Sequence, residues 1–256
     1  TVVDPAEGPL ASGLVGQGRL PEPDALVAEI TRWLAKHRGA TPVRSLAGRT
    51  VLVTAGPTRE AADPVRFLSN GSTGTMGFEI AAAAARRGAA VTLLAGPVAL
   101  DTPPGVTRVD VVTADSLLRE ALAHADADVV VAAAAVSDYA PADVSAVKLA
   151  KTDGDLTMRL RRTPDVLAAL GAQKRPGQTL VGFALETHNG EAHARAKLAR
   201  KGLDWIALNA ADAPGEGFGT GTNRLTLLSA DGRRVEVPLG SKRTVAEALL
   251  DAVTAV

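Results

Sequence analysis

Apolar and polar residues form a repeating pattern from residue 46 onward, in which short apolar runs alternate with segments of helical periodicity. The runs at 50–55, 90–95, 106–112 and 128–134 predict strands, and the segments at 77–87 and 116–124 predict helices. Strands that are apolar along almost their whole length are typical of parallel sheets covered on both faces. The pattern therefore predicts an α/β fold with a Rossmann-like, doubly wound and mostly parallel sheet.

The pattern becomes mixed after residue 140. Apolar and polar residues alternate at 156–161, which predicts a half-buried strand, and apolar runs predict buried strands at 179–184 and 204–208. Residues 224–238 predict a β-hairpin that turns at Asp231 and Gly232. Ser241 is a suitable N-cap for a last helix that runs to the C-terminus. The sheet is thus expected to continue into a mixed C-terminal part with a β-hairpin.

Residues 1–44 differ in composition from the rest of the chain. They are rich in Pro and Gly and predict one helix, at 25–37, after the start signal Pro23-Asp24. A segment of this length buries little core by itself. We therefore expect two parts, residues 1–44 as a tail and linker and residues 45–256 as one domain.

Charge and cysteine content narrow the classes of function. The 28 Lys and Arg residues balance the 28 Asp and Glu residues, so no overall field attracts nucleic acid or an anionic membrane. The chain has no cysteine, which excludes disulfides, thiolate metal sites and cysteine nucleophiles. Its four histidines show no metal-ligand spacing, so a metal held by protein side chains alone is not expected. With no apolar run that could span a bilayer, the expected location is the cytoplasm.

A glycine-rich stretch, SNGSTGTMG, ends the long loop after the first predicted strand. Gly71, Gly74 and Gly77 recur just before an alanine-rich helix, where backbone amides and the helix N-terminus can approach an anion. Nearby hydroxyl donors are Ser69, Ser72, Thr73 and Thr75. The alternative interpretation is a tight turn with a helix cap, because a lone glycine-rich loop is a weak signal.

Two common nucleotide-binding motifs are missing. A dinucleotide fingerprint would require G-x-G-x-x-G close after the first strand and an acidic residue ending the second, which here ends in VTLLAGP. The P-loop motif G-x-x-x-x-G-K-[ST] is also missing. An NAD(P)-dependent Rossmann oxidoreductase and a non-catalytic nucleotide-binding module remain as alternative functions.

Further candidate residues lie in three polar stretches. Asp138 follows the fourth predicted strand, and Lys148 lies farther along a segment that could equally be a solvated loop. Asp165 stands at a helix start, where simple capping is the alternative role. Lys197 and Lys201 are four residues apart and share one helical face, which by itself would suit a solvated surface.

A series of motifs nevertheless resembles one family in order and spacing. The chain contains TAGPTRE, DPVRFLSN, GSTGTMG, AAAARRGAAVTLLAGPVAL, AAVSDY, KLAK, TPDVLAALG, VGFALET and ARAKLARKGLDWIALN. They resemble the phosphopantothenoylcysteine synthetase half of the bacterial bifunctional phosphopantothenoylcysteine decarboxylase/phosphopantothenate–cysteine ligase, from residue 46 to the C-terminus. The stretch PLASGLVGQGRLPEP is similar to the tail of the decarboxylase half, although Ser12 stands where that family commonly has cysteine. The resemblance implies that FMN belongs only to the missing decarboxylase half.

The implied reaction joins 4′-phosphopantothenate and L-cysteine in coenzyme A biosynthesis. The carboxylate of phosphopantothenate would attack the α-phosphate of CTP, forming an acyl cytidylate and pyrophosphate. The amine of cysteine would then attack the acyl carbon and release CMP. Neither step needs a protein nucleophile, so the protein must hold two anions together and stabilise developing charge, with Mg²⁺ on the triphosphate. The base stays open between CTP and ATP, because related eukaryotic enzymes use ATP.

Carried over motif by motif, the resemblance implies a role for each candidate residue. The nucleotide pocket comprises Ala132, Ala133, Ala134, Asp138, Lys148, Pro164, Asp165, Val166, Leu167, Phe183, Lys197 and Lys201. Lys148 would lie on a mobile flap over the reacting phosphate, and the two lysines at 197 and 201 would face the triphosphate. Ser69, Gly71, Ser72, Gly74 and Gly77 form the phosphate and acyl loop. Asn70 would donate a hydrogen bond to the acyl carbonyl during attack by cysteine.

The family also implies partners. A homodimer is expected, with the site completed across the interface by the region after Asp143. Residues 156–161 and 224–238 are the candidate interface pieces. The decarboxylase half of the same polypeptide is a further expected partner, whereas nucleic acid and membranes are not.

Overall fold

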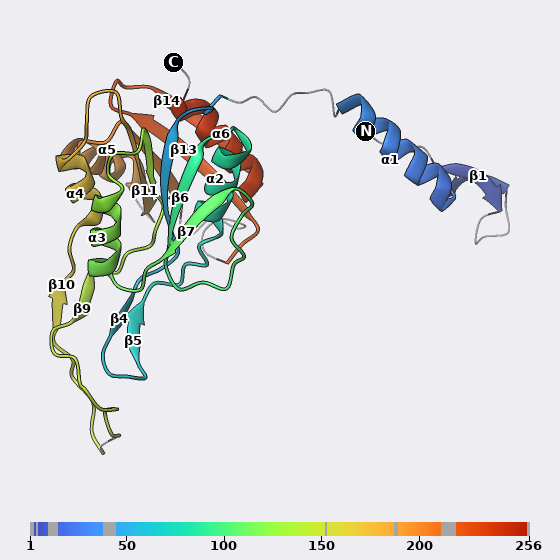
Figure 1. Ribbon diagram of the computed structural model, residues 1–256. Helices are drawn as coiled ribbons and strands as arrows, with labels where there is room; N and C mark the ends of the chain where they lie inside the picture. Colours follow the sequence, from blue (N-terminus) through green and yellow to red (C-terminus); the bar gives the residue numbers. More distant parts are fainter. Residues whose placement is uncertain are drawn as a thin grey trace. The chain divides into compact units, whose positions relative to one another are not determined.

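The computed structural model describes residues 3, 5–9, 15–37, 45–151, 153–186, 189–210 and 219–254 (Figure 1). The chain forms two compact units, Thr1–Val43 and Arg44–Val256. The first contains a hairpin of β1 (Ala6–Pro9) and β2 (Val15–Arg19), followed by α1 (Pro23–His37). The helix begins at Pro23, two residues before the predicted start, because proline suits the first turn of a helix. The hairpin was not predicted.

The second unit is built on an eight-stranded sheet of order β14-β13-β12-β11-β8-β3-β6-β7. The parallel strands are β3 (Thr50–Ala55), β6 (Ala90–Ala95), β7 (Val106–Asp110), β8 (Val129–Ala132), β11 (Thr179–Glu186) and β12 (Trp205–Ala210). The antiparallel strands β13 (Thr222–Ser229) and β14 (Arg234–Ser241) form the predicted C-terminal hairpin. The predicted doubly wound, mostly parallel α/β fold is confirmed. Its chain order reverses between β3 and β8, which makes the edge beyond them the topological switch point.

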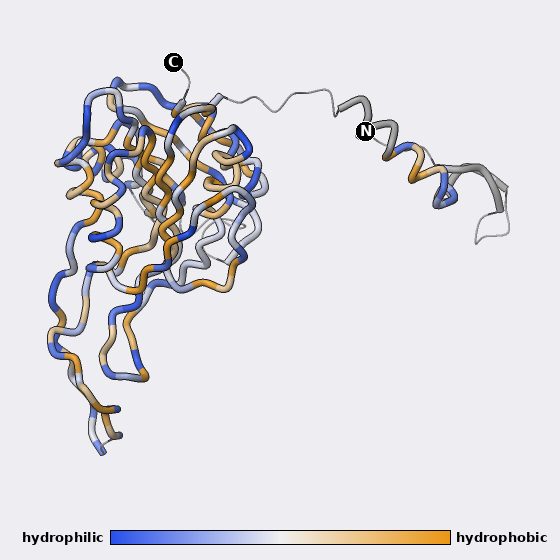
Figure 2. Tube along the Cα trace, viewed as in Figure 1, coloured by the Kyte–Doolittle hydropathy of each residue, from blue (hydrophilic) through white to orange (hydrophobic). Residues whose placement is uncertain are grey.

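Helices cover both faces of this sheet (Figure 1). One face packs against α2 (Thr75–Arg86) and α6 (Lys242–Thr254), and the other against α3 (Ala114–Ala123), α4 (Val166–Ala172) and α5 (Gly190–Arg200). On β3, Val51 and Val53 lie in the core with α2 and α6, whereas Leu52 lies in the core with the other three helices. Figure 2 shows the resulting apolar strands in orange. Burial on both faces explains why the central strands β3, β6 and β8 are apolar at most positions rather than at alternate ones.

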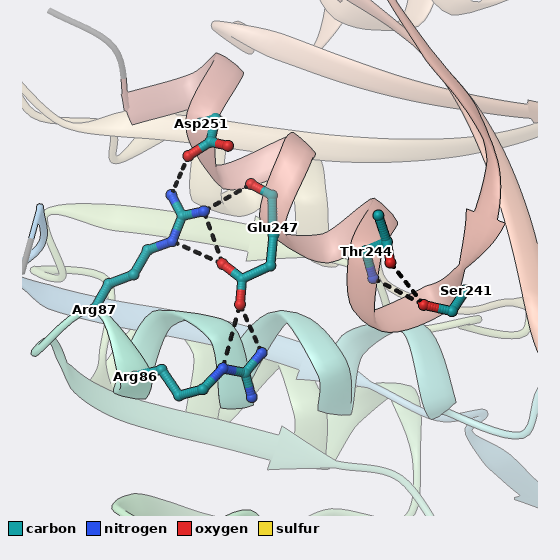
Figure 3. Close-up of polar contacts among 6 residues, drawn as sticks. All are labelled: Arg86, Arg87, Ser241, Thr244, Glu247 and Asp251. Atoms are coloured by element: carbon teal, nitrogen blue, oxygen red, sulfur yellow. Dashed lines mark hydrogen bonds and ion pairs between the residues drawn. The ribbon is translucent and has the colours of Figure 1, made fainter. Parts of the chain in front are cut away.

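Helices α2 and α6 are joined by a cluster of ion pairs (Figure 3). The Glu247 carboxylate accepts from Arg86 Nη2 at 2.7 Å and Arg87 Nη2 at 2.8 Å, and Arg87 Nη1 lies 2.8 Å from Asp251 Oδ1. Partial burial raises the pKa of Glu247, but the two arginines outweigh it and lower the pKa overall. At the other end of α6, Ser241 Oγ accepts from the Thr244 amide at 3.1 Å, as the predicted cap requires.

Two projections extend from the carboxyl ends of the parallel strands (Figure 1). The hairpin, β4 (Arg59–Ala61) and β5 (Phe67–Ser69), follows β3 and was not predicted. The arm, residues 139–162, begins with β9 (Tyr139–Pro141) and ends with β10 (Leu160–Arg162), which pair with each other. The prediction of a half-buried strand at 156–161 is wrong, because only its last two residues belong to β10 and all of β10 is exposed. Its alternation has no sheet to pack against.

Candidate functional site

The loops that leave β3 and β8 are hydrogen-bonded to each other at the switch point. The Ala135 amide donates to the Gly56 carbonyl at 2.9 Å, and the Thr58 amide donates to the Ala135 carbonyl at 3.4 Å. Within the sheet, the buried Thr54 hydroxyl accepts from the Ala134 amide at 3.1 Å. These bonds hold the two loops side by side where open α/β sheets bind their ligands.

Asn70 adds a third segment to the switch point. Its Nδ2 donates to the carbonyl oxygens of Ala135 and Val136, both at 3.1 Å. The preceding residue is held as well, because Ser69 Oγ donates to the Thr58 carbonyl at 2.7 Å. Both amide hydrogens of Asn70 are therefore engaged by the loop after β8. Donation to a ligand, the predicted role, requires that one of these bonds be exchanged.

The glycines of the predicted phosphate and acyl loop have unequal structural roles. Gly74 adopts a left-handed conformation, φ +78°, immediately before α2, and a Cβ at Gly77 would lie 2.5 Å from that of Ala55. These two positions therefore require glycine for the turn and for close helix–strand packing. A Cβ at Gly71 would meet open space, and Ser72 Oγ accepts from the Gly74 amide at 3.2 Å. The first turn of α2 has no side-chain cap bond and no acidic residue, which leaves its partial positive charge available to an anion.

The predicted nucleotide pocket draws on both faces of the sheet. Ala133 and Phe183 pack at the edge of the core that contains α2 and α6. Ala132 and Ala134 pack at the edge of the core with α3, α4 and α5. Ala132 ends β8 and the other two alanines follow it, while Phe183 lies on β11, which pairs with β8. The alanines therefore surround the carboxyl end of β8 rather than forming one flat wall.

The residues predicted around the start of α4 divide into buried and accessible ones. Val166 and Leu167 are core side chains. Pro164 is half-buried, and Asp138 is exposed with its backbone carbonyl accepting from the Thr163 amide at 3.1 Å. Val166 and Leu167 therefore present little side-chain surface to a ligand, whereas Pro164, Asp165 and Asp138 present more.

Lys197 and Lys201 do not form a solvated basic face. Lys197 Nζ donates to the Phe183 carbonyl at 2.7 Å, and Lys201 Nζ lies 2.9 Å from Asp165 Oδ1 with only 13% of its side chain exposed. Asp165 also caps α4 by accepting from the Ala168 amide at 3.0 Å. Partial burial raises the pKa of Asp165, but the bonds from Lys201 and Ala168 outweigh it and lower the pKa overall. Four of the predicted residues, from β11, α4 and α5, are thus brought together.

Lys148 lies apart from this group, on the arm. Its side chain is exposed. The next residue, Leu149, is bound through its backbone to the hairpin, because its amide donates to Asp63 Oδ2 at 3.1 Å and its carbonyl accepts from Arg66 Nη1 at 3.0 Å. The position of Lys148 therefore depends on the hairpin.

Asn209 is a residue of this edge that sequence reasoning missed. It lies near the carboxyl end of β12 opposite Leu185 of β11, and its Oδ1 is buried without a hydrogen-bond partner among the described residues. A buried acceptor without a partner is costly in a folded protein and suits a site for a ligand donor. The sequence contains a signal for this residue, because Asn209 directly follows a run of apolar residues. Asp138 likewise comes after the apolar run of β8.

Within the described part of the chain, no three His, Cys, Asp or Glu side chains gather into a group able to hold a metal ion. No helix within the same residues has the length and apolar character needed to cross a membrane.

Comparison with known proteins agrees with this fold. Residues 46–256 match the family described as the DNA/pantothenate metabolism flavoprotein C-terminal domain. Over 255 residues the chain is 44% identical to the coenzyme A biosynthesis bifunctional protein CoaBC of Bacillus subtilis (strain 168), covering 99% of this chain and 62% of that protein. The chain therefore spans less than two thirds of this relative's length.

Two solved structures extend the comparison. The C-terminal domain of a coenzyme A biosynthesis bifunctional protein CoaBC is similar with a TM-score of 0.71 and 39% identity, over 82% of this chain and 96% of that one. The DNA/pantothenate metabolism flavoprotein from Streptococcus pneumoniae is similar with a TM-score of 0.67 and 25% identity, over 80% and 98%. With the family match spanning the whole sheet and its ligand edge, the chain belongs to the DNA/pantothenate metabolism flavoprotein C-terminal domain family.

Proposed function

We propose that this chain is a phosphopantothenate–cysteine ligase that activates 4′-phosphopantothenate with CTP and transfers the acyl group to L-cysteine. The observation that carries the proposal is the meeting of Lys197, Lys201, Asp165 and Phe183 next to the switch point that holds Asn70. Family membership supports the same reaction. We also take residues 1–44 as the tail of a decarboxylase half, with FMN belonging to that half.

The first step must bring two anions together. A triphosphate is a stronger partner for the ammonium groups of Lys197 and Lys201 than a carbonyl or one carboxylate, because charge-assisted bonds are stronger than neutral ones. The existing bonds to Phe183 and Asp165 keep the lysines in place before the nucleotide arrives. Pre-positioned cations of this kind offset repulsion without reorganising during the reaction.

Mg²⁺ would arrive with the triphosphate as part of the substrate. Phosphate oxygens and waters supply most of its ligands in such complexes, so few protein groups are needed. Asp138, exposed in the segment that follows β8, is the carboxylate predicted to accept from the base, the sugar or a metal-bound water.

The second step would use Asn70. Its two amide hydrogens contact adjacent backbone carbonyls, so the acyl oxygen can replace one of them as acceptor while the other bond holds the side chain. A neutral donor stabilises the tetrahedral oxyanion without a proton transfer to or from the amine of cysteine. Lys148 would act earlier, on the phosphate that is being attacked.

We infer that the working form is a homodimer. The hairpin and arm carry several large apolar side chains that are exposed, and Figure 2 shows apolar stretches along both projections. These side chains are Val65, Phe67, Leu68, Tyr139, Val144, Val147, Leu156, Met158 and Leu160. A set of this size marks an interaction surface, and a second copy is the commonest partner for one. Sedimentation velocity should show twice the mass of the chain.

The test of the function is pyrophosphate release. Purified protein is mixed with phosphopantothenate and each nucleoside triphosphate in turn, with and without L-cysteine. We expect a single turnover with CTP alone and continuous turnover when cysteine is added. A higher rate with ATP would show that ATP, not CTP, is the activating nucleotide. No pyrophosphate release with any nucleotide would contradict the proposal.

A further inference from the structure

Asp63 occupies the loop between the two strands of the hairpin, and its side chain has no exposed surface. Oδ1 accepts from the amides of Val65 at 2.7 Å and Arg66 at 2.8 Å, which shapes the local turn. Oδ2 accepts from Arg66 Nη1 at 2.9 Å and from the Leu149 amide at 3.1 Å. Oδ1 therefore binds only hairpin residues, whereas Oδ2 binds both the hairpin and the arm.

The arm is held at this place by several backbone contacts. Arg66 Nη1 also donates to the Leu149 carbonyl at 3.0 Å, and the Ser145 amide donates to the Ala62 carbonyl at 3.0 Å. Both backbone groups of Leu149, the residue after Lys148, are thus bound by the Asp63–Arg66 pair. Burial raises the pKa of Asp63, but the backbone amides and Arg66 outweigh it and lower the pKa, so the acceptor stays ionised near neutral pH.

The same hairpin leads directly to the switch point. Its second strand, β5, ends at Ser69, and the next residue, Asn70, donates two hydrogen bonds to the loop after β8. The hairpin therefore connects the switch point at one end with the backbone next to Lys148 at the other. Residues 142–151 and 153–159 form no helix or strand, so their position depends on such contacts.

We propose that Asp63 is a positioning residue for nucleotide activation, which holds the arm so that Lys148 lies over the reacting phosphate. The inference rests on the proposed function, because it assigns Asp63 an effect only through Lys148. A purely structural role, in which Asp63 shapes the hairpin turn and nothing else, is the competing explanation.

Asp63→Asn separates the two roles. In this variant Oδ1 still accepts from the amides of the turn, and an Nδ2 amide group replaces Oδ2. Because Nδ2 cannot accept a hydrogen bond from Arg66 or from the Leu149 amide, the contact to the arm is lost. We expect kcat for pyrophosphate release to fall about tenfold or more, since a misplaced group loses its orientation advantage, while CTP affinity changes less than about twofold. Hydrogen exchange of the peptide around Leu149 should become faster. The matched control is Asp251→Asn. Asp251 lies on α6, where it pairs with Arg87, and its replacement should leave kcat unchanged.

A double-mutant cycle with Lys148→Gln then distinguishes the outcomes. If Asp63 acts through Lys148, adding Asp63→Asn to Lys148→Gln should change kcat by less than about twofold. Equal losses in both backgrounds, or an unchanged kcat in Asp63→Asn, would overturn the inference. Normal turnover in Lys148→Gln alone would instead remove the proposed role of Lys148.

A second variant covers the case in which Asp63→Asn does not fold. Leu149→Pro removes the amide that Asp63 accepts from and leaves the hairpin sequence intact. The same loss of kcat with retained CTP binding is expected, and wild-type kcat in Leu149→Pro would count against the inference.

Discussion

The sheet face covered by α2 and α6 and the two projections at the carboxyl ends of the parallel strands are held by different kinds of contact. The α2–α6 face is held by buried apolar side chains. It is also held by an ion-pair cluster between the two helices, in which the Arg87 side chain is only 11% exposed (Figure 3). The hairpin and arm consist of three-residue strands and exposed apolar side chains, joined by single backbone bonds and by Asp63.

This difference separates stability from function. A core face resists change because its contacts are many and buried, whereas a segment with few contacts can move at low cost. The residues proposed for chemistry, Lys148 and Asn70, lie on or next to the second kind of segment. Substitutions on the projections should therefore change turnover more than stability, and substitutions on the α2–α6 face should do the reverse.

Lys148→Gln should have the largest effect. Loss of one electrostatic donor at the reacting phosphate is expected to lower the rate of pyrophosphate release by roughly 10²-fold or more. Because the side chain is exposed, the melting temperature and CTP affinity should stay close to wild type. Lys151→Gln, three residues farther along the arm, is the matched control. Near-normal turnover in Lys148→Gln would remove this lysine from the site.

Asn70→Ala should separate the two half-reactions. Pyrophosphate should still appear in a burst, while attack by cysteine slows by roughly 10- to 100-fold because the oxyanion donor is lost. Asn70→Asp should be at least as impaired, since a carboxylate repels the oxyanion and also the carbonyls of Ala135 and Val136. A missing burst with normal CTP binding would assign Asn70 to activation instead.

Lys197→Ala and Lys201→Ala should weaken CTP binding by about tenfold each, the scale of one charged hydrogen bond. CMP should be affected much less, because it lacks the phosphates that the lysines are proposed to contact. Calorimetric titration of both nucleotides measures the difference. Equal losses for CTP and CMP would mean that the lysines act only through Asp165 and Phe183.

Glu247→Gln should have the smallest effect, and only on stability. Removing the charge between Arg86 and Arg87 is expected to cost about 1 kcal/mol after solvent screening, with kcat unchanged. The folded pKa of Glu247 lies below its ordinary value of 4.5, so this stabilisation is full above pH 4.5 and is lost as the pH falls through the folded pKa. Denaturant unfolding at pH 7 and pH 3 should show the difference from wild type shrinking at the lower pH.

The two regions also differ in how far the sequence predicts them. The bounds of β3 and β6 match the prediction, because burial on both faces makes these strands almost wholly apolar and a glycine follows each of them. The strand predicted at 156–161 failed, because alternation shows which side chains share a face but not whether a partner sheet exists.

The site shows the same limit. Motifs indicated Asn70, Lys197 and Lys201, but their partners lie far along the chain, as the bond between Asn70 and Ala135 illustrates. Asp63 was part of a recognised motif without an assigned role, because its contact with Leu149 spans 86 residues and has no local signature. Long-range hydrogen bonds between loops have no periodicity to read.

We propose that this edge of the sheet activates an acid as its cytidylate before cysteine is involved. The decisive measurement is rapid quenching of protein, phosphopantothenate and CTP without cysteine, followed by mass spectrometry. We expect a species with the mass of phosphopantothenate joined to CMP, in an amount close to that of the sites, which disappears when cysteine is added. If product forms with cysteine, but neither this species nor pyrophosphate forms without it, activation does not precede the attack by cysteine.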